Sequence, residues 1–288
     1  MPSLYIVATP IGNLEDISLR ALRVLREVKL IAAEDTRKTK RLLNAYGIKA
    51  PATSYHEHNK LTKLDYLLEC LEDRDIALVS EAGTPGISDP GYELIVAANQ
   101  RGIPVIPIPG PSAIITALVV SGLPTDRFTY LGFLPHKATA RQRLLKSAAD
   151  ECGTLVLLES PHRFLAALKD VLLILGDRRI AVCRELTKLH EEVFRGTVSQ
   201  AIEHFTERRG EFTLIIEGKK ERNKPQITKD IERQLHDMYL SGATVKEAVT
   251  QAAEETSLSK KELYRTWLSF NKSVEKGKKD SCHSPGRR

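Results

Sequence analysis

Short apolar segments alternate with helical segments along the first 120 residues of the chain. The apolar runs Leu4–Ala8, Ile76–Ser80 and Val105–Ile108 have the length of buried strands, and the amphipathic segment Thr36–Tyr46 is one of those between them. Strands separated by helices pair in parallel, and the resulting sheet is covered by helices on both faces. The pattern therefore predicts an α/β domain over residues 1–120.

The same periodicity predicts the other elements of this half and of the next. They are a helix at Leu19–Val28, strands at Leu30–Glu34, Phe128–Phe133, Leu155–Leu158, Ile180–Arg184, Glu192–Gly196 and Phe212–Glu217, and helices at Tyr92–Gln100, Ser112–Ser121, Lys137–Ala149 and Pro161–Leu175. The rhythm restarts near Gly122–Pro124. Only one short helix separates the last two strands, so we expect a second α/β domain with a mixed sheet over residues 121–222.

After Lys219 the strand pattern ends. Residues 228–240, 244–256 and 259–270 are predicted to be three helices with a helix-turn-helix appearance, and Thr244 and Ser259 are N-caps with a Glu three residues later. We therefore predict a helical extension over residues 223–270. The remaining residues 271–288 have no apolar period and are expected to form a disordered basic tail.

The net charge of +6 is concentrated at the C-terminal end. Residues 1–218 hold equal numbers of basic and acidic side chains, whereas residues 219–288 hold 16 Lys and Arg against 10 Asp and Glu. A basic extension on a neutral body is typical of a chain that binds a polyanion. The alternative interpretation is a solubilising surface, and it applies best to the tail.

The four cysteines are widely scattered along the chain. Cys70, Cys152, Cys183 and Cys282 have neither the spacing of a zinc site nor that of a disulfide framework, so we expect no metal. Together with the lack of a signal peptide, they indicate a reducing cytoplasm. No apolar run approaches the roughly 18 residues of a spanning helix, so no membrane contact is expected.

Loops rich in Gly and Pro follow three of the predicted strands. They are Ala8–Asn13, Ser80–Gly91 and Pro107–Ala113. Ligands bind beyond the carboxyl ends of parallel strands, and glycine lets the backbone approach them closely. We therefore predict that the three loops face one ligand-binding crevice. Ser112 has two possible roles there, as the cap of the following helix or as a ligand contact.

Charged side chains follow two other strands. Two acids and then four cations occupy the segment Ala33–Arg41, and cations at a helix N-terminus oppose the helix dipole. The cations either bind phosphates or form a solvated helix face. The segment Glu159–Arg163 follows another strand, and His162 and Arg163 either bind an anion at the helix start or form an ordinary surface turn.

Several common chemistries are excluded by missing motifs. The chain has no G-x-G-x-x-G dinucleotide fingerprint and no P-loop lysine. It also has no G-x-S-x-G nucleophile elbow. Dinucleotide binding, P-loop nucleotide hydrolysis and serine-hydrolase chemistry are therefore not predicted.

These segments resemble the tetrapyrrole methylase superfamily. The motifs that carry the resemblance are Ala8–Asn13, Ala33–Arg37, Ser80–Gly91, Pro109–Ala113, Glu159–Arg163 and Arg184–Thr197. Within the superfamily, the sequences SEAGTPGISDPG and ESPHR are similar to the small-subunit ribosomal RNA methyltransferase I branch. The resemblance covers about residues 4–270. It implies two α/β domains with a cofactor cleft between them, followed by a small C-terminal helical unit.

The resemblance also implies a cofactor, a reaction and partners. The methyl donor would be S-adenosylmethionine, and the product a cytidine methylated on its ribose 2′-oxygen in the decoding region of 16S rRNA in the small ribosomal subunit. A homodimer is implied as well. The family's cofactor contacts fall on Pro10, Gly83, Thr84, Ile87, Ser88, Ser112, Ala113, Leu158, Leu186 and Thr213.

A ribose hydroxyl is a weak acid, so we predict that a carboxylate assists its deprotonation. Glu81 is the first candidate and Asp35 the second, while the alternative role of Glu81 is to brace its own loop. The RNA contacts are predicted at Arg37, Lys38, Lys40, Arg41, Glu159 and Arg163, with Arg163 on a phosphate.

Two other functions are alternatives to rRNA methylation. One is methylation of a precorrin or other tetrapyrrole, which the basic stretch after Lys219 disfavours because a small macrocycle does not need it. The other is that of a catalytically inactive RNA-binding relative, which the intact Gly/Pro loops disfavour.

Overall fold

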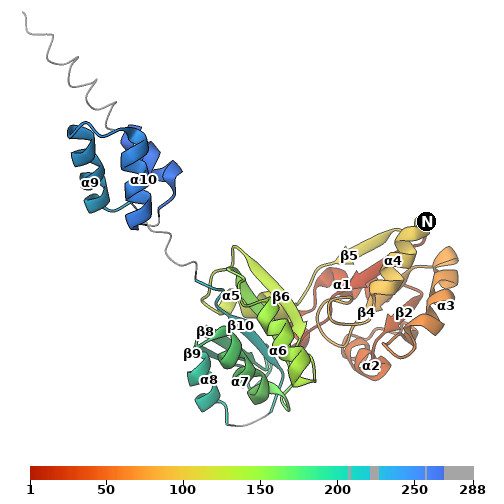
Figure 1. Ribbon diagram of the computed structural model, residues 1–288. Helices are drawn as coiled ribbons and strands as arrows, with labels where there is room; N and C mark the ends of the chain where they lie inside the picture. Colours follow the sequence, from red (N-terminus) through yellow and green to blue (C-terminus); the bar gives the residue numbers. More distant parts are fainter. Residues whose placement is uncertain (207–208, 221–226, 257, 269–288) are drawn as a thin grey trace, which may run out of the picture. The chain divides into compact units, whose positions relative to one another are not determined.

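The computed structural model describes residues 1–206, 209–220, 227–256 and 258–268. The chain divides into two compact units, Met1–Lys219 and Lys220–Arg288. The first unit contains two sheets with flanking helices, and the second is helical (Figure 1).

The first sheet is parallel throughout, with the strand order β3-β2-β4-β1-β5. Its strands are β1 (Leu4–Val7), β2 (Leu30–Ala33), β3 (Ala52–Ser54), β4 (Ile76–Val79) and β5 (Val105–Ile108). Each residue of β2 and β4 is buried, as expected for inner strands covered on both faces. Because β4 and β5 lie on opposite sides of β1, the loops that follow these three strands are neighbours at one edge.

Helices cover both faces of this sheet. They are α1 (Leu19–Glu27), α2 (Thr36–Ala45), α3 (Lys60–Asp73), α4 (Tyr92–Gln100) and α5 (Ala113–Val120), with the short 3-10 helix η1 (Leu14–Asp16) before α1. One apolar cluster joins α1 and α2 to the sheet, and another joins α3 and α4 to its opposite face. The predicted two-sided packing is confirmed.

The second sheet has the strand order β6-β7-β10-β8-β9. Its strands are β6 (Phe128–Phe133), β7 (Thr154–Glu159), β8 (Arg179–Arg184), β9 (Glu192–Thr197) and β10 (Phe212–Ile216), and its helices are α6 (Ala138–Ser147), α7 (Phe164–Leu175) and α8 (Val198–His204). Only β6 and β7 pair in parallel, so the predicted mixed sheet is confirmed. A cluster that contains Ala117 and Leu118 of α5 with Val156 and Ile215 packs the two halves of this unit together.

The second unit has an apolar core of its own. The core lies between α9 (Lys229–Leu240), α10 (Val245–Thr256) and a helix over residues 260–268. Trp267 packs edge-on against Tyr239, with 5.4 Å between ring centroids. The predicted capping interactions are present, since Glu247 N donates to Thr244 Oγ1 at 3.3 Å and Glu262 N donates to Ser259 Oγ at 3.3 Å. Residues 269–270 of the predicted third helix and the predicted tail 271–288 lie outside the described residues.

One predicted boundary differs from the structure, and some elements were not predicted. The helix predicted from Pro161 begins at Phe164, because residues 161–163 form a turn in which Arg163 N donates to Ser160 O at 3.1 Å. Neither β3 nor α3 was predicted. The first has only three residues, and the second was missed although Leu64, Leu67, Leu68 and Leu71 repeat at helical spacing.

Candidate functional site

The loops after β1, β4 and β5 converge at one edge of the first sheet. Thr9 N donates to Gly83 O at 2.9 Å, and Gly83 N donates to Thr9 O at 3.0 Å. Gly83 has a left-handed φ of +78°, and a Cβ atom there would lie 3.8 Å from the carbonyl oxygen of Pro111. A side chain at this position would thus be strained. The prediction that the three loops face one crevice is confirmed.

The first loop also contacts the charged loop between β8 and β9. A Cβ atom on Gly12 would lie 2.5 Å from Lys188 Cγ and 2.9 Å from the carbonyl oxygen of Leu186, so a larger residue does not fit. Glu185 and Thr187, on either side of Leu186, have left-handed φ angles of 51° and 66°. Left-handed backbone at non-glycine residues is strained and clusters at ligand sites. The loops of the two sheets therefore enclose one cavity.

This cavity, the main cleft, has a volume of about 310 Å³. Eight of the ten predicted cofactor contacts line it: Gly83, Thr84, Ile87, Ser112, Ala113, Leu158, Leu186 and Thr213. Pro10 lines an adjoining pocket instead, and Ser88 lies outside the wall with its hydroxyl 2.7 Å from that of Tyr130. Ser112 caps α5, because its Oγ accepts from Ile115 N in the first turn, and it also lines the cleft, where it can contact a ligand.

Three carboxylates, Glu34, Glu81 and Asp89, line one side of the main cleft. Glu34 Oε2 accepts from Glu81 N at 3.0 Å, and Glu81 forms an ion pair with Lys38. Burial, followed by the nearby charge of Glu34, raises the pKa of Asp89 to about 7. Burial also raises the pKa of Glu34. Glu34 and Asp89 were not singled out from the sequence, although each follows a strand or lies in a cleft loop.

A smaller basic pocket of about 180 Å³ adjoins the main cleft. Lys38 and Arg41 of α2 line it together with Pro10 and Leu14, and Glu81 belongs to both cavities. Lys40 is exposed on the same helix but lines no described pocket. Lys40 and Arg41 form no ion pair within the described residues. The α2 cations therefore extend from the cleft to the open surface.

A third cavity, the histidine pocket, is lined by His56 and His58 and by the start of α2. Its volume is about 430 Å³, and Glu34 and Glu81 connect it to the main cleft. Asp35 lies here rather than in the main cleft and caps α2. Its bond with the Arg37 side chain, and then that with Arg37 N, lowers the pKa of Asp35 to about 2. Arg37 is therefore paired with the capping carboxylate, and its side chain is 87% exposed.

The predicted pair Glu159 and Arg163 lies at the end of β7. Glu159 lines the main cleft and is buried, whereas Arg163 does not line it. Arg163 Nη2 lies 2.7 Å from Glu159 Oε1, Nη1 donates to Leu134 O at 2.7 Å, and Nε donates to Ser160 Oγ at 3.0 Å. Because each guanidinium nitrogen has a partner inside the fold, Arg163 is placed to hold Glu159 rather than a phosphate.

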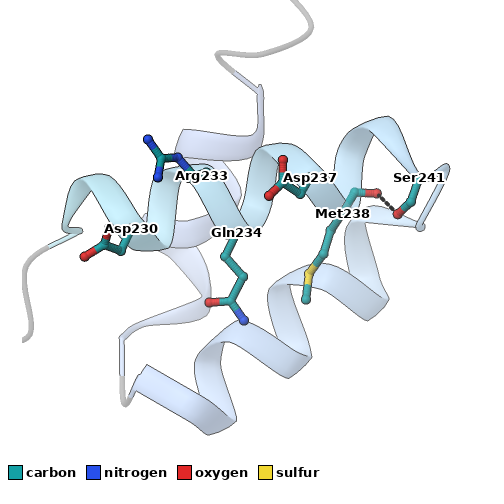
Figure 2. Close-up of a pocket in the computed structure, with 6 residues that line it drawn as sticks. All are labelled: Asp230, Arg233, Gln234, Asp237, Met238 and Ser241. Carbon is teal, nitrogen blue, oxygen red and sulfur yellow. Dashed lines mark hydrogen bonds between the residues drawn. The ribbon is translucent and has the colours of Figure 1, made fainter.

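Another hollow, of about 530 Å³, lies along α9 in the second unit. Figure 2 shows its lining residues, Asp230, Arg233, Gln234, Asp237, Met238 and Ser241, distributed along this single helix. Their side chains point in different directions, and the one bond between them joins the hydroxyl of Ser241 to the carbonyl oxygen of Met238 at 2.9 Å (Figure 2). In the main cleft, by contrast, polar side chains from several loops of both sheets line one cavity.

Two further classes of site are absent from the described part of the chain. Those residues contain no group of three or more His, Cys, Asp or Glu side chains arranged to hold a metal ion. None of their helices has both the length and the apolar character needed to cross a bilayer.

Three proteins similar to this chain carry the name "Ribosomal RNA small subunit methyltransferase I". The protein of Halalkalibacterium halodurans is 48% identical over 273 residues, which are 92% of this chain and 94% of that protein. The Escherichia coli O157:H7 protein is 45% identical over 268 residues, 91% of this chain and 93% of that one. The Thermotoga maritima protein is 51% identical over 222 residues, which are 76% of this chain and all of that protein.

Solved structures with the same fold include a uroporphyrin-III-C-methyltransferase from Thermus thermophilus, with a TM-score of 0.54 and 23% identity over 75% of this chain and 94% of that one. A diphthine synthase has a TM-score of 0.60 at 14% identity and covers 74% of this chain and 89% of its own. The family model "Tetrapyrrole (Corrin/Porphyrin) Methylases" matches residues 3–202. The chain therefore belongs to the tetrapyrrole (corrin/porphyrin) methylase family.

Proposed function

We propose that this protein transfers a methyl group from S-adenosylmethionine to the ribose 2′-oxygen of a cytidine in the decoding region of 16S rRNA. The observation that carries the proposal is similarity along nearly the whole chain to proteins named as small-subunit rRNA methyltransferases. We further infer that it acts as a homodimer in the cytoplasm, where the small ribosomal subunit is available.

The main cleft fits the methyl donor of this family. When bound, S-adenosylmethionine supplies a methyl group activated by a positively charged sulfonium. The described lining residues include five carboxylates and no Lys or Arg, which suits a cation better than a phosphate. The eight predicted contacts that line the cleft would hold the cofactor, with backbone groups of the Gly/Pro loops placed for close approach.

The residues of the chain contribute mainly position and proton transfer. Methyl transfer is an in-line displacement, so its rate depends on how the loops orient the ribose hydroxyl toward the donor. We propose Glu81 as a proton acceptor, because it lies where the main cleft meets the basic pocket. Asp89 is a further candidate on the same wall. Asp35 is a weaker candidate, because its capping role and low pKa make it a poor base.

RNA would reach the cleft across α2. Lys38 and Arg41 line a pocket that shares Glu81 with the main cleft, so a phosphate bound there would place the adjoining ribose close to the carboxylates. Lys40 and Arg37 lie on the same helix and would extend this surface. The helical unit after Lys219 would provide a second RNA contact.

Tritiated methyl transfer tests the proposal. Purified small ribosomal subunits lacking the modification should be labelled, whereas a porphyrinoid should not. Labelling of the porphyrinoid alone would favour a tetrapyrrole methylase, and cofactor binding without any transfer would indicate an inactive RNA-binding relative. The Glu81→Gln variant should have a reduced turnover at saturating RNA, and unchanged turnover would remove Glu81 as the base.

A further inference from the structure

One oxygen of Glu159 is buried without a hydrogen-bond partner. The side chain lies at the end of β7, and the residue is 2% exposed. Its Oε1 accepts from Ser160 N at 2.7 Å and pairs with Arg163 Nη2 at 2.7 Å, whereas Oε2 has no partner. Other described side chains also have a buried polar atom without a hydrogen-bond partner, but of these residues only Glu159 lines the main cleft. A buried acceptor left unpaired is costly, so a bound ligand that donates to it is favoured.

The carboxylate is fixed in this position. Arg163 is held in turn by Leu134 O at 2.7 Å and by Ser160 Oγ at 3.0 Å, so the guanidinium and the carboxylate form a rigid pair. Glu159 also pairs in register with Phe212 of β10. An acceptor that cannot rotate away discriminates between ligands by the presence or absence of a donor at one point.

The surrounding wall suits a flat, partly apolar ligand. Leu158, Pro161 and Phe212 line the main cleft beside Glu159, and so does Phe133, which is 51% exposed. Aromatic and aliphatic faces stack on nucleobases, and a carboxylate accepts from the exocyclic amino group at a base edge. Apolar faces and an unpaired acceptor therefore occur together at this end of the cleft.

We propose that Glu159 Oε2 accepts a hydrogen bond from the exocyclic amino group of a nucleobase bound in the main cleft. The inference rests on the proposed function, which brings two such groups to the protein: the adenine amine of the cofactor and the cytosine amine of the target nucleotide. The chemistry at Glu159 is the same for both sources, and ligand analogues without the amine distinguish them.

The cofactor arm compares S-adenosylhomocysteine with S-inosylhomocysteine, in which an oxygen replaces the amine. If adenine is the source, the wild-type protein should bind the adenosine compound at least about tenfold more tightly, as expected for a hydrogen bond to a buried charge. The Glu159→Gln variant should narrow or reverse this ratio, because its amide can donate to the inosine oxygen. Isothermal titration calorimetry measures both affinities.

The substrate arm uses small subunits reconstituted with cytidine or uridine at the methylated position. If cytosine is the source, wild-type kcat/KM should favour cytidine at least about tenfold, and Glu159→Gln should shift the preference toward uridine. A change of ligand preference between wild-type protein and Glu159→Gln in either experiment supports the inference. The experiment in which the preference changes identifies the nucleobase, adenine or cytosine, that donates to Glu159.

Asp170→Asn is the matched control. Asp170 forms the other buried carboxylate–arginine pair of this half, with Arg141 Nε at 2.6 Å, but it does not line the cleft. This variant should lose stability while keeping wild-type discrimination in both arms. If Glu159→Gln fails to fold, the two comparisons with wild-type protein can still overturn the inference, because it requires discrimination in at least one of them.

Equal affinity for both cofactor analogues together with equal use of cytidine and uridine would overturn the inference and leave Glu159 as a brace for the turn before α7. That result with intact methyl transfer to unmodified subunits would leave the proposed function standing. Absence of all methyl transfer would instead count against the proposed function. The comparison of S-adenosylhomocysteine with S-inosylhomocysteine would then be the remaining test of the role of Glu159.

Discussion

Carboxylates around the main cleft behave differently because their surroundings differ. Asp35 accepts bonds from Arg37 at the start of α2 and has a pKa of about 2, whereas burial brings the pKa of Asp89 to about 7. Glu159 is paired with an arginine through one oxygen only. Separated pKa values, such as those of Asp35 and Asp89, are typical of acid and base roles in active sites.

Asp89 should make the reaction depend on pH. If it accepts the ribose proton, kcat should fall as the pH drops below about 7, where the carboxylate becomes protonated. Asp89→Asn should lower kcat about 100-fold, within the usual range for general bases, and remove this limb of the profile. Single-turnover methylation from about pH 5.5 to about pH 9 provides the measurement. An unchanged profile in the variant would exclude the role.

The same substitution should stabilise the protein at high pH. The folded-state pKa of Asp89 lies above its ordinary value of 3.8, so the folded state binds the proton more tightly and its stability falls as pH rises from about 4 to about 7. Removing the buried charge should therefore raise the Tm above pH 7 by about 2–4 °C, the shift that about 1 kcal/mol causes in a protein of this size. Near pH 4 the two proteins should melt alike. Scanning calorimetry at both pH values distinguishes these cases.

At the residue scale, the sequence predicts where the ligand loops lie better than it predicts the burial and contacts of individual side chains. The composition of Ser80–Gly91 indicates a ligand loop, but the raised pKa of Asp89 depends on its burial in the fold and on the charge of Glu34, which follows another strand. Likewise, Arg163 was predicted to bind a phosphate, and its engagement with Leu134 O comes from a residue 29 positions away. Long-range contacts of this kind have no local signature.

At the scale of elements, α2 connects the main cleft to the proposed RNA-binding surface. Asp35 caps its first turn, which offsets the unfavourable placement of cations near the positive end of the helix dipole. Lys38 pairs with Glu81, while Arg41 lines the basic pocket without an ion pair in the described residues. The two interpretations of the cluster, phosphate binding and solvated face, can be separated by salt dependence.

Arg41→Ala should weaken binding to small subunits and reduce the slope of log K against log salt by about 0.7–0.9 for each phosphate that the arginine neutralises. Lys169→Ala is the control, because Lys169 is exposed on α7 and lines no described pocket. Filter binding at several salt concentrations measures both slopes. Equal slopes for wild-type and Arg41→Ala would assign the cluster to a solvated helix face.

Element types were predictable where the apolar period was long or the strand was bounded by Gly and Pro. The inner strands β2 and β4 are apolar at each position and were predicted almost to their ends. The start of α7 was misplaced because Pro161 suits a first helical turn, but the bonds of Ser160 with Glu159 and Arg163 hold a separate turn there. The edge strand β3 is too short to show a period.

At the scale of the whole molecule, the boundary between the neutral and the basic part of the sequence coincides with the boundary between the two compact units. The neutral residues 1–218 coincide closely with the unit Met1–Lys219, which contains the cleft, and the basic excess lies after it. The Thermotoga maritima relative aligns over its whole length with 222 residues of this chain, close to the size of that unit. We therefore expect Met1–Lys219 to bind the cofactor without the helical extension.

Deleting residues 225–288 should weaken binding to small subunits and flatten its salt dependence, because the basic extension would no longer contact phosphates. Affinity for S-adenosylhomocysteine should remain within about threefold of the wild-type value, since the cleft is formed by the first unit. Parallel titrations with subunits and cofactor check this. Unchanged subunit affinity at several salt concentrations would remove the extension as an RNA contact.

The proposed reaction is tested most directly by mass-spectrometric mapping of modified nucleotides in 16S rRNA from cells with and without the protein. A ribose-methylated cytidine in the decoding region should be absent without the protein and restored by the wild-type chain, but restored poorly by the Glu81→Gln variant. An identical modification map in both cells would contradict the proposed function.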